Sequence, residues 1–367
     1  MKGLLKSTTM MVAAAALAAG ATAASAAEVE LNVISWGGAY TSSQLRAYHE
    51  PYMAENPEVQ LNSIDYSGGL AEVRAQTEAG NVTWDLVDTT VSDSIRGCDE
   101  GLFMAIDHNE LLESAPDGTM ATDDFMFGTE YECFIPQIIY STAFAFRTDV
   151  SEWGGNLPTS IADVFDLDGF PGKRTLQRSP INNLEWALLA DGVPAGEVYD
   201  VLDTPEGVDR AFAKLGEIKD EVIWWTEGAV PAQLLADGEV VFGTGYNGRL
   251  FSAIEEEKQP MQILWDGQVL DLDGWSIPAD GNNIDAVLEF VRFATDTQRL
   301  ADQAKFISYG PARASSQPLV GQHADLGIDM APHMPTLYAD QGFLFDFEWW
   351  ADNRDSLNER FEAWLAQ

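Results

Sequence analysis

Cysteine and histidine, which often act as nucleophile, base or zinc ligand, are scarce in this chain of 367 residues. It has two cysteines and four histidines, and no His-Glu-x-x-His zinc motif is present. A Gly-x-Ser-x-Gly nucleophile motif and a phosphate-binding Gly-x-x-x-x-Gly-Lys loop are also absent. We therefore expect no metal site, no cofactor and no enzymatic activity. A secreted hydrolase stays open as an alternative, because many carboxylates allow a pair at glycosidase spacing by chance.

Positive charge is scarce as well. The chain has 20 lysines and arginines against 59 aspartates and glutamates, a formal net charge of -39 at pH 7. Because phosphate recognition depends on lysine and arginine, this balance excludes a nucleic-acid partner. Two interpretations of the acidic surface stay open, an electrostatic funnel for cations and a general adaptation to salty surroundings.

Long apolar runs are absent except near the N-terminus. Lys2 and Lys6 precede an apolar stretch over residues 10–19, and Ala24-Ser25-Ala26 has the small residues of a cleavage site. This pattern is typical of a secretory signal peptide, which we place at residues 1–26. No later run reaches the roughly 20 apolar residues of a membrane-spanning helix, so we expect an exported, periplasmic protein.

Export bears on the redox state of the two cysteines, Cys98 and Cys133. An oxidising compartment favours a disulfide between them, and chain entropy gives a bridge of this loop size roughly 3–4 kcal/mol of stability. Two free thiols are the alternative.

Strands and helices alternate along the first part of the mature chain. Apolar runs predict strands at residues 31–35, 59–66 and 85–87, and amphipathic patterns predict helices at 42–56 and 69–80. This alternation indicates βαβ units and a parallel α/β sheet. Ligands of such sheets collect where strands end and helices begin, as at Trp36 and Gly38.

The mature chain is too long for one ordinary core and indicates two lobes. The nearly uncharged run at residues 134–146 predicts a buried strand that passes from one lobe to the other. Further helices are predicted at residues 183–189, 205–215, 231–237 and 283–295. We assign residues 27–140 and 271–316 to lobe 1, and residues 141–270 and 317–367 to lobe 2, so that the lobes are interwoven.

Two segments between residues 238 and 278 combine polar and aromatic side chains. We interpret residues 245–249 as a turn in which glycines allow close approach and Tyr246 offers a ring with a polar tip. Residues 271–278 are predicted as a second turn, where Asp273 and Trp275 bring a carboxylate close to an aromatic face. Such a combination suits an organic cation, although a core tryptophan beside a surface turn explains it equally well.

These motifs resemble the periplasmic solute-binding proteins of ABC importers, specifically the spermidine/putrescine branch. The matching features are a strand ending in Trp36, then Trp84-Asp85-Leu86-Val87, then Tyr246-Asn247-Gly248, then Asp273 four residues before Ile277-Pro278. The resemblance implies a two-lobed flytrap fold with a ligand cleft at the hinge. It also implies a monomer that captures a small cationic or zwitterionic amine and delivers it to ABC permease subunits in the inner membrane.

The resemblance also implies ligand-binding residues. Trp36 matches the family's stacking tryptophan, Tyr246 stands where a tryptophan is usual, and Asp273 matches the amine-binding carboxylate. The full predicted set consists of Trp36, Gly38, Asp93, Tyr140, Arg178, Tyr246, Asp273 and Trp275.

Two departures from the polyamine pattern concern the ligand. Arg178 and Asn182 stand where polyamine binders have acidic residues, and Ser92 and Asp93 replace an aromatic. An arginine repels an ammonium group but binds a carboxylate through paired hydrogen bonds. The main prediction is a polyamine or related amine, and the alternative is a zwitterion such as γ-aminobutyrate or a betaine. Arg178 as a surface residue paired with a nearby acid also stays open.

Overall fold

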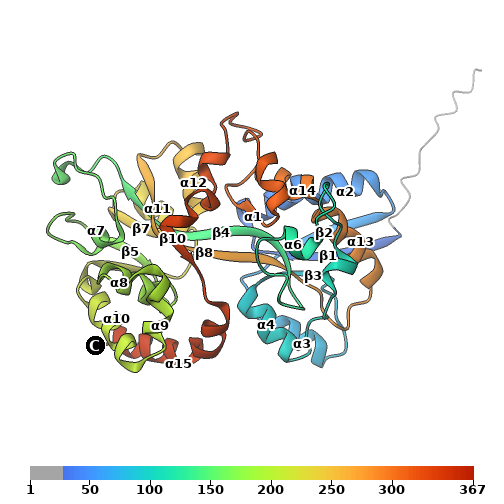
Figure 1. Cartoon of the computed structure of the whole chain (residues 1–367), viewed down its shortest axis with the longest axis horizontal. Helices are drawn as coiled ribbons and strands as arrows, with labels where there is room; N and C mark the ends of the chain where they lie inside the picture. The colour runs from blue at the N-terminus through green and yellow to red at the C-terminus, as the bar shows by residue number, and fades with distance from the viewer. Residues whose placement is uncertain (1–27) are drawn as a thin grey trace, which may run out of the picture.

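A computed structural model of the chain describes residues 28–367. The predicted signal peptide, residues 1–26, lies outside the described residues. The molecule has two lobes side by side, joined by the long strands β4 and β8 (Figure 1). Among the described residues, no helix has the length and apolar character needed to cross a membrane.

One mixed sheet continues through both lobes in the order β2-β1-β3-β8-β4-β7-β5-β6, with β10 beside β8 and β9 beside β4. β1, β2 and β3 are mutually parallel in lobe 1, as are β5, β6 and β7 in lobe 2. β4 and β8 pair antiparallel with each other and with the flanking strands. The strands are β1 Val29–Ser35, β2 Val59–Asp65, β3 Leu86–Thr90, β4 Ile135–Arg147, β5 Arg174–Gln177, β6 Val222–Trp225, β7 Phe242–Tyr246, β8 Met261–Ser276, β9 Gly310–Pro311 and β10 Gly342–Leu344.

Helices complete the two lobes. In the lobe 1 part of the chain they are α1 Gly38–Gln44, the π-helix η1 Leu45–His49, α2 Glu50–Glu55, α3 Ala71–Glu78, α4 Val91–Asp99, α5 His108–Leu111, α6 Ala121–Asp124, α13 Ile284–Ala294 and α14 Thr297–Gln303. Lobe 2 and the hinge contribute α7 Ile161–Phe165, α8 Asn183–Ala190, α9 Val198–Leu202, α10 Pro205–Gly216, α11 Val230–Ala236, α12 Asn247–Phe251, the π-helix η5 Ser252–Glu256 and α15 Phe347–Leu365. Short 3-10 turns are η2 Ser151–Trp153, η3 Ala195–Glu197, η4 Lys219–Glu221, η6 Ala314–Leu319, η7 Ala331–His333 and η8 Pro335–Gln341.

Each lobe has its own hydrophobic core. In lobe 1, Leu31 and Val33 of β1 pack with Phe290 of α13. In lobe 2, Trp186 of α8 and Phe242 of β7 belong to a larger cluster that also includes side chains of α15. Because all but two residues of β4 are buried, this strand can pass between the two cores, as its uncharged sequence predicts.

The predicted α/β, two-lobed fold is confirmed, with differences at three places. Residues 245–249, predicted as a turn, are the end of β7 followed directly by the start of α12. The predicted helix at residues 42–56 begins earlier, at Gly38, and contains the π-helical turn η1. The predicted turn at residues 271–278 is wrong, because residues 271–276 continue β8. This strand is hydrogen-bonded to β3 on one side and β4 on the other, and the two ladders override the turn preference of Asp273-Gly274. The residue boundaries of the two lobes stay a prediction.

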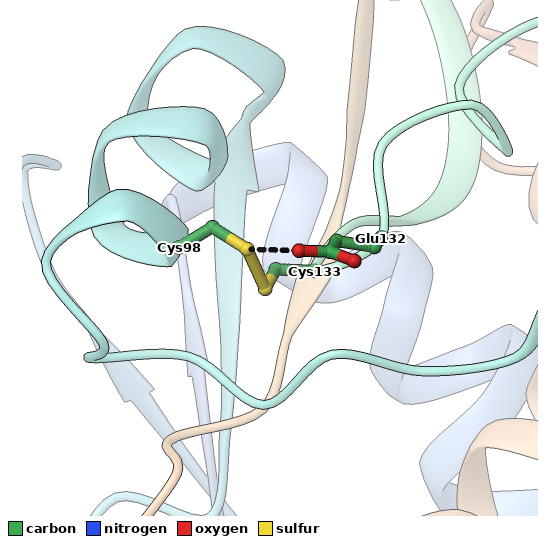
Figure 2. Close-up of side chains that lie close together, drawn as sticks. All are labelled: Cys98, Glu132 and Cys133. Atoms are coloured by element: carbon green, nitrogen blue, oxygen red, sulfur yellow. Dashed lines mark hydrogen bonds between the residues drawn. A yellow bond between two sulfur atoms is a disulfide. The ribbon is translucent and has the colours of Figure 1, made fainter.

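The predicted disulfide between Cys98 and Cys133 is present and joins the end of α4 to the segment before β4 (Figure 2). Glu132 lies beside it, so the two sulfurs and this carboxylate gather within 4.8 Å of one another. Because both sulfurs are bonded to each other, neither is available as a thiolate ligand for a metal.

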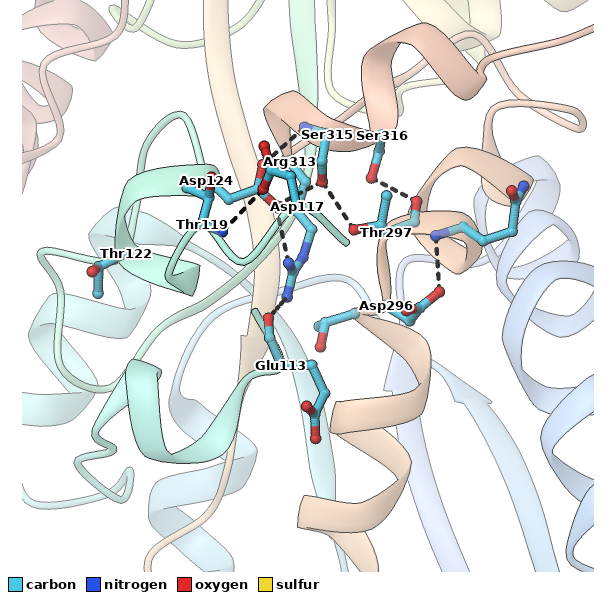
Figure 3. A network of polar contacts seen from close by, with 12 residues as sticks. Glu113, Asp117, Thr119, Thr122, Asp124, Asp296, Thr297, Arg313, Ser315 and Ser316 are labelled. Carbon is cyan, nitrogen blue, oxygen red and sulfur yellow. Dashed lines mark hydrogen bonds and ion pairs between the residues drawn. The ribbon is translucent and has the colours of Figure 1, made fainter. Parts of the chain in front are cut away.

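A buried ion pair fixes the segment that follows β9. The guanidinium Nη1 of Arg313 lies 3.0 Å from Oδ2 of Asp124 on α6, and both side chains are buried. Arg313 also donates to the carbonyl oxygen of Glu113, and the amide of Ser315 donates to Asp124 (Figure 3). These bonds give both buried charges hydrogen-bonded partners and so offset part of their desolvation cost. The network belongs to the lobe 1 scaffold.

Candidate functional site

A cavity of about 570 Å³ lies between the lobes, against the hinge strands β4 and β8. Its walls come from both lobes: β1, β2 and β3 of lobe 1 and β5, β6 and β7 of lobe 2 end at the cavity, and β4 and β8 run past it. Its lining consists of Trp36, Gly37, Gly38, Tyr40, Tyr66, Ser67, Thr90, Ile138, Tyr140, Gln177, Trp225, Thr226, Glu227, Gly228, Ala229, Tyr246, Arg249, Asp273 and Tyr309.

Lobe 1 supplies a stacked pair of aromatic rings. Ser35 of β1 is in register with Asp65 of β2, so the next residues, Trp36 and Tyr66, meet at the same edge of the parallel sheet. Their ring centroids are 4.9 Å apart. Gly68 makes room for this pair, since a Cβ there would lie 2.8 Å from the Trp36 ring and its φ of 90° suits glycine.

Asp273 lines the same cavity as the rings of Trp36 and Tyr66. It lies on β8 opposite Thr90 of β3, and it is buried. Burial raises its pKa well above the usual range, and the nearby Asp88 raises that pKa further. No lysine or arginine lies within ion-pair distance of Asp273 among residues 28–367. A buried carboxylate without a cation, surrounded by aromatic faces, is suited to an organic ammonium group.

Lobe 2 supplies an arginine to the opposite wall. Arg249 lies in the first turn of α12, directly after β7, and its Cζ is 5.8 Å from the centroid of the Tyr246 ring. Its guanidinium has no ion-pair partner within 4 Å among the residues that the structure describes. Gly248 allows α12 to approach Tyr309, because a Cβ there would lie 2.6 Å from that ring. Arg249 is half-buried and lines the main cavity, where its guanidinium is accessible to a ligand.

Arg249 and Asp273 both affect the pKa values of Tyr246 and Tyr309. Burial raises the pKa of Tyr246; Arg249 lowers it, and Asp273 adds to the increase. Burial also raises the pKa of Tyr309, again with opposing effects of Arg249 and Asp273. Arg249 and Asp273 line the main cavity together with Tyr246 and Tyr309.

A second cavity of about 130 Å³ adjoins the first, and Thr90, Tyr140, Gln177 and Tyr246 line both. Here the hydroxyl of Tyr140 donates to Asp271 at 2.7 Å. Burial raises the pKa of Asp271 to about 6. The remaining lining includes Ser92, Asn182 and Arg354.

Five of the eight residues predicted to bind ligand line the main cavity. They are Trp36, Gly38, Tyr140, Tyr246 and Asp273. The structure thus brings them together, and their contact with a ligand stays a prediction.

Trp275 is not part of this lining. It lies on the same face of β8 as Asp273 but further into lobe 1, where its ring packs 5.8 Å from Tyr48 and 5.9 Å from Phe290. It is fully buried in the core because helices cover the sheet at this point. The core alternative for this tryptophan is therefore the correct one.

Arg178 lies outside both cavities. Gln177, the last residue of β5, points into them, so the next side chain points to the other side. Arg178 is about half exposed, and its Nε donates to Oε1 of Glu362 on α15 at 3.0 Å. The expectation that Arg178 faces the cleft is wrong, and the surface alternative applies.

Asp93 also lies outside both linings. It stands in the first turn of α4, where its Oδ1 is 3.5 Å from Nη1 of Arg354 on α15. The helix starts directly after β3, which turns this side chain toward lobe 2 instead of into the main cavity.

Sequence reasoning missed several lining residues, namely Tyr40, Tyr66, Gln177, Arg249 and Tyr309. Two of them carried a signal in the sequence. Tyr66 ends a predicted strand as Trp36 does, and Arg249 belongs to the segment 245–249, whose glycines and Tyr246 are typical of a functional turn.

Two lobes on one sheet, with an aromatic and charged cavity at the hinge, are the architecture of a solute-binding protein. The model of the bacterial extracellular solute-binding protein family matches residues 47–336. This chain belongs to that family. The predicted family is thereby confirmed at this level.

Individual relatives differ in ligand. The chain is 36% identical over 345 residues to the gamma-aminobutyric acid-binding protein of Pseudomonas aeruginosa, covering 94% of this chain and 93% of the relative. The solved structure of the Atu4243-GABA receptor is 31% identical with a TM-score of 0.75, and the match covers 92% of this chain and 98% of the other. The PBP MotA from A. tumefaciens in complex with glucopine is 27% identical with a TM-score of 0.78, covering 92% and 99%.

The polyamine branch is not specifically supported. A spermidine/putrescine-binding protein from Streptococcus pneumoniae has a TM-score of 0.63 at 14% identity, covering 92% of this chain and 99% of the other. At that identity the likeness shows the fold alone.

Proposed function

We propose that this protein is the periplasmic receptor of an ABC importer for a small ω-amino acid, with γ-aminobutyrate as the leading candidate. The observation that carries the proposal is the presence of Asp273 and Arg249 in one cavity, each without an ion-pair partner among the described residues. An ammonium group binds at Asp273, between the aromatic rings of lobe 1. The carboxylate at the other end of the ligand binds Arg249 of lobe 2.

A ligand that is bound at both ends would also link binding to closure of the two lobes. Asp273 lies on a strand shared by both lobes, whereas Arg249 follows a lobe 2 strand. A zwitterion that contacts both favours the closed arrangement, which is the form that permease subunits would recognise. The two relatives named for γ-aminobutyrate are consistent with this ligand class.

A diamine is the second candidate because of one residue. Glu227 lines the same cavity from the loop between β6 and α11 and offers a second carboxylate. Arg249 opposes this candidate, since a second ammonium group would enter the cavity beside an unpaired guanidinium.

Calorimetric titration with γ-aminobutyrate and with putrescine distinguishes these ligands. Wild-type protein is expected to bind γ-aminobutyrate more tightly than putrescine. Arg249→Gln should weaken γ-aminobutyrate binding about 30-fold or more, because removing one partner of a buried charge pair costs about 2–5 kcal/mol. Asp273→Asn should weaken it more than about tenfold for the same reason.

Arg178→Gln is the matched control, since it removes an arginine that pairs on the surface with Glu362. It should leave both affinities unchanged. Tight putrescine binding by wild type, with no loss of γ-aminobutyrate affinity in Arg249→Gln, would overturn the proposal in favour of the diamine.

A further inference from the structure

A second carboxylate lies close to Asp273 and has no role in the site described so far. In the antiparallel ladder of β3 and β8, Thr90 is opposite Asp273 and Asp88 is opposite Trp275. Residues directly opposite share a face of the sheet, and so do residues two apart on one strand. Asp88 and Asp273 therefore project from the same face as diagonal neighbours.

Asp88 is completely buried and held in place by neutral groups. The Nε2 of Gln44 donates to both carboxylate oxygens at 3.0 Å, and the hydroxyl of Tyr40 lies 3.5 Å from one of them. No lysine, arginine or histidine lies within ion-pair distance of Asp88 in residues 28–367. Tyr40 also lines the main cavity, so Asp88 sits one side chain away from the ligand space.

For two buried carboxylates that are diagonal neighbours and lack a cation, the state with both groups ionised is disfavoured. Each pays the cost of leaving water, and each adds a repulsive charge to the other. Burial raises the pKa of Asp88 and of Asp273, and Asp88 raises that of Asp273 further.

Other ionisable groups around the pair do not compensate these charges. The ionisable groups around Asp88 are tyrosines and acids. Arg249 and Arg354 lie further out, where they lower the pKa values of Tyr246, Tyr309 and Asp271. The groups are Tyr40, Tyr48, Tyr66, Asp93, Tyr140, Tyr246, Asp271, Tyr309, Arg249 and Arg354.

We propose that Asp88 is a specificity-determining residue that acts through Asp273: the two carboxylates keep a proton while the cleft is empty, and an entering ammonium group expels it. This inference rests on the proposed function, because it takes Asp273 as the ammonium partner. No covalent bond to the ligand forms. The O–H bond of one carboxylic acid breaks, the proton goes to solvent, and the carboxylate that remains pairs with the ammonium group.

Selection for cations follows from this exchange. A neutral group cannot replace the charge of the expelled proton, so the proton stays on the pair and the neutral group gains no ion pair with Asp273. Binding of an ammonium group strengthens as pH rises, because the complex holds fewer protons than the free protein. The increase ends once the free protein has lost the proton without help from the ligand.

The test is the affinity for γ-aminobutyrate as a function of pH. This probe stays a zwitterion between about pH 6 and 9, since its groups resemble those with pKa values near 4.3 and 10.4. Wild-type affinity should rise up to tenfold per pH unit and then level off. In Asp88→Asn, the levelling-off should move at least about one unit lower, because a like charge beside Asp273 is gone. Asparagine can still accept a hydrogen bond from Gln44.

Glu185→Gln is the matched control. Glu185 is a fully buried carboxylic acid in lobe 2 that lines neither cavity. Its removal should leave the pH profile unchanged. Titration in two buffers of different ionisation enthalpy should show proton release on binding to wild type and reduced release for Asp88→Asn near neutral pH. A pH-independent wild-type affinity, or superimposable wild-type and Asp88→Asn profiles, would overturn the proposal.

Infrared spectroscopy keeps the proposal testable if Asp88→Asn does not fold or γ-aminobutyrate does not bind. At about pH 8, above the pKa values of about 7 for Glu185 and about 6 for Asp271, the unliganded Glu185→Gln protein should show a protonated-carboxyl C=O band that is lost when Asp273→Asn is added or weakened at still higher pH. Failure of γ-aminobutyrate to bind at any pH would overturn the proposed function, and the infrared result would still decide whether the pair holds a proton. Absence of the band would refute the proton-holding pair.

Discussion

Glu185 shows how a single buried acid makes stability depend on pH. It is fully buried in α8, and its Oε1 accepts hydrogen bonds from the indole of Trp350 at 2.6 Å and the hydroxyl of Tyr199 at 3.1 Å. Burial raises the pKa of Glu185 from its ordinary 4.5 to about 7. The folded protein therefore binds this proton more tightly than the unfolded chain, and the stabilisation is present below pH 4.5 and lost as pH rises through 7.

Glu185→Gln removes this dependence because glutamine stays neutral. Relative to wild type, the variant should gain stability between pH 5 and pH 8, on the order of 2–3 kcal/mol, because most of the interval between the two pKa values falls in this range at about 1.4 kcal/mol per pH unit. Glutamine keeps an acceptor for Trp350 and Tyr199. Urea unfolding of both proteins at the two pH values measures the effect. An equal stability difference at both values would contradict the assignment.

At the level of single residues, the sequence predicts part of the candidate site. Trp36 and Asp273 could be predicted because their positions at a strand end and before Ile-Pro match a family pattern. The arginine could not be placed, since Arg178 and Arg249 both follow lobe 2 strands. Which of them faces the cavity depends on side-chain alternation at the end of β5 and on the start of α12, and both are fixed by strand pairing distant in sequence.

Among the elements, apolar runs predict most strands because buried strands need continuous apolar residues. The mistaken element, residues 271–276, has Asp and Gly, which are typical of turns. Its strand conformation depends on β3 and β4 pairing on both sides, and these contacts span more than a hundred residues. Local preference predicts an element only where no such long-range ladder competes with it.

The disulfide is the covalent link between two elements, α4 and the start of β4. Replacing Cys98 and Cys133 together by serine should lower the free energy of unfolding by about 3–4 kcal/mol, because the unfolded chain regains the entropy of a loop with a sequence separation of 35. Urea unfolding of the variant and of wild type measures this. Wild type unfolded without reductant should react with no thiol reagent. Two reactive thiols would mean that the bridge is absent from the protein.

At the scale of the whole molecule, the lobes also touch beside the smaller cavity. The hydroxyl of Ser92 on α4 donates to the carbonyl of Phe347 on α15 at 3.3 Å, and Arg354 of α15 faces Asp93 of α4 at 3.5 Å. These contacts join helices of different lobes. They exist only while the lobes are close together, so they favour the closed arrangement independently of any ligand contact.

The Arg354–Asp93 pair should therefore affect affinity through closure. Arg354 is about one-third exposed, so the pair is worth at most about 1 kcal/mol, and breaking it should weaken γ-aminobutyrate binding about two- to fivefold. Calorimetry on Arg354→Gln, Asp93→Asn and the double variant measures this as a double-mutant cycle. If the pair acts only as an interlobe contact, the double variant should be no weaker than either single variant. A loss of more than tenfold in Asp93→Asn alone would instead return this carboxylate to direct ligand binding.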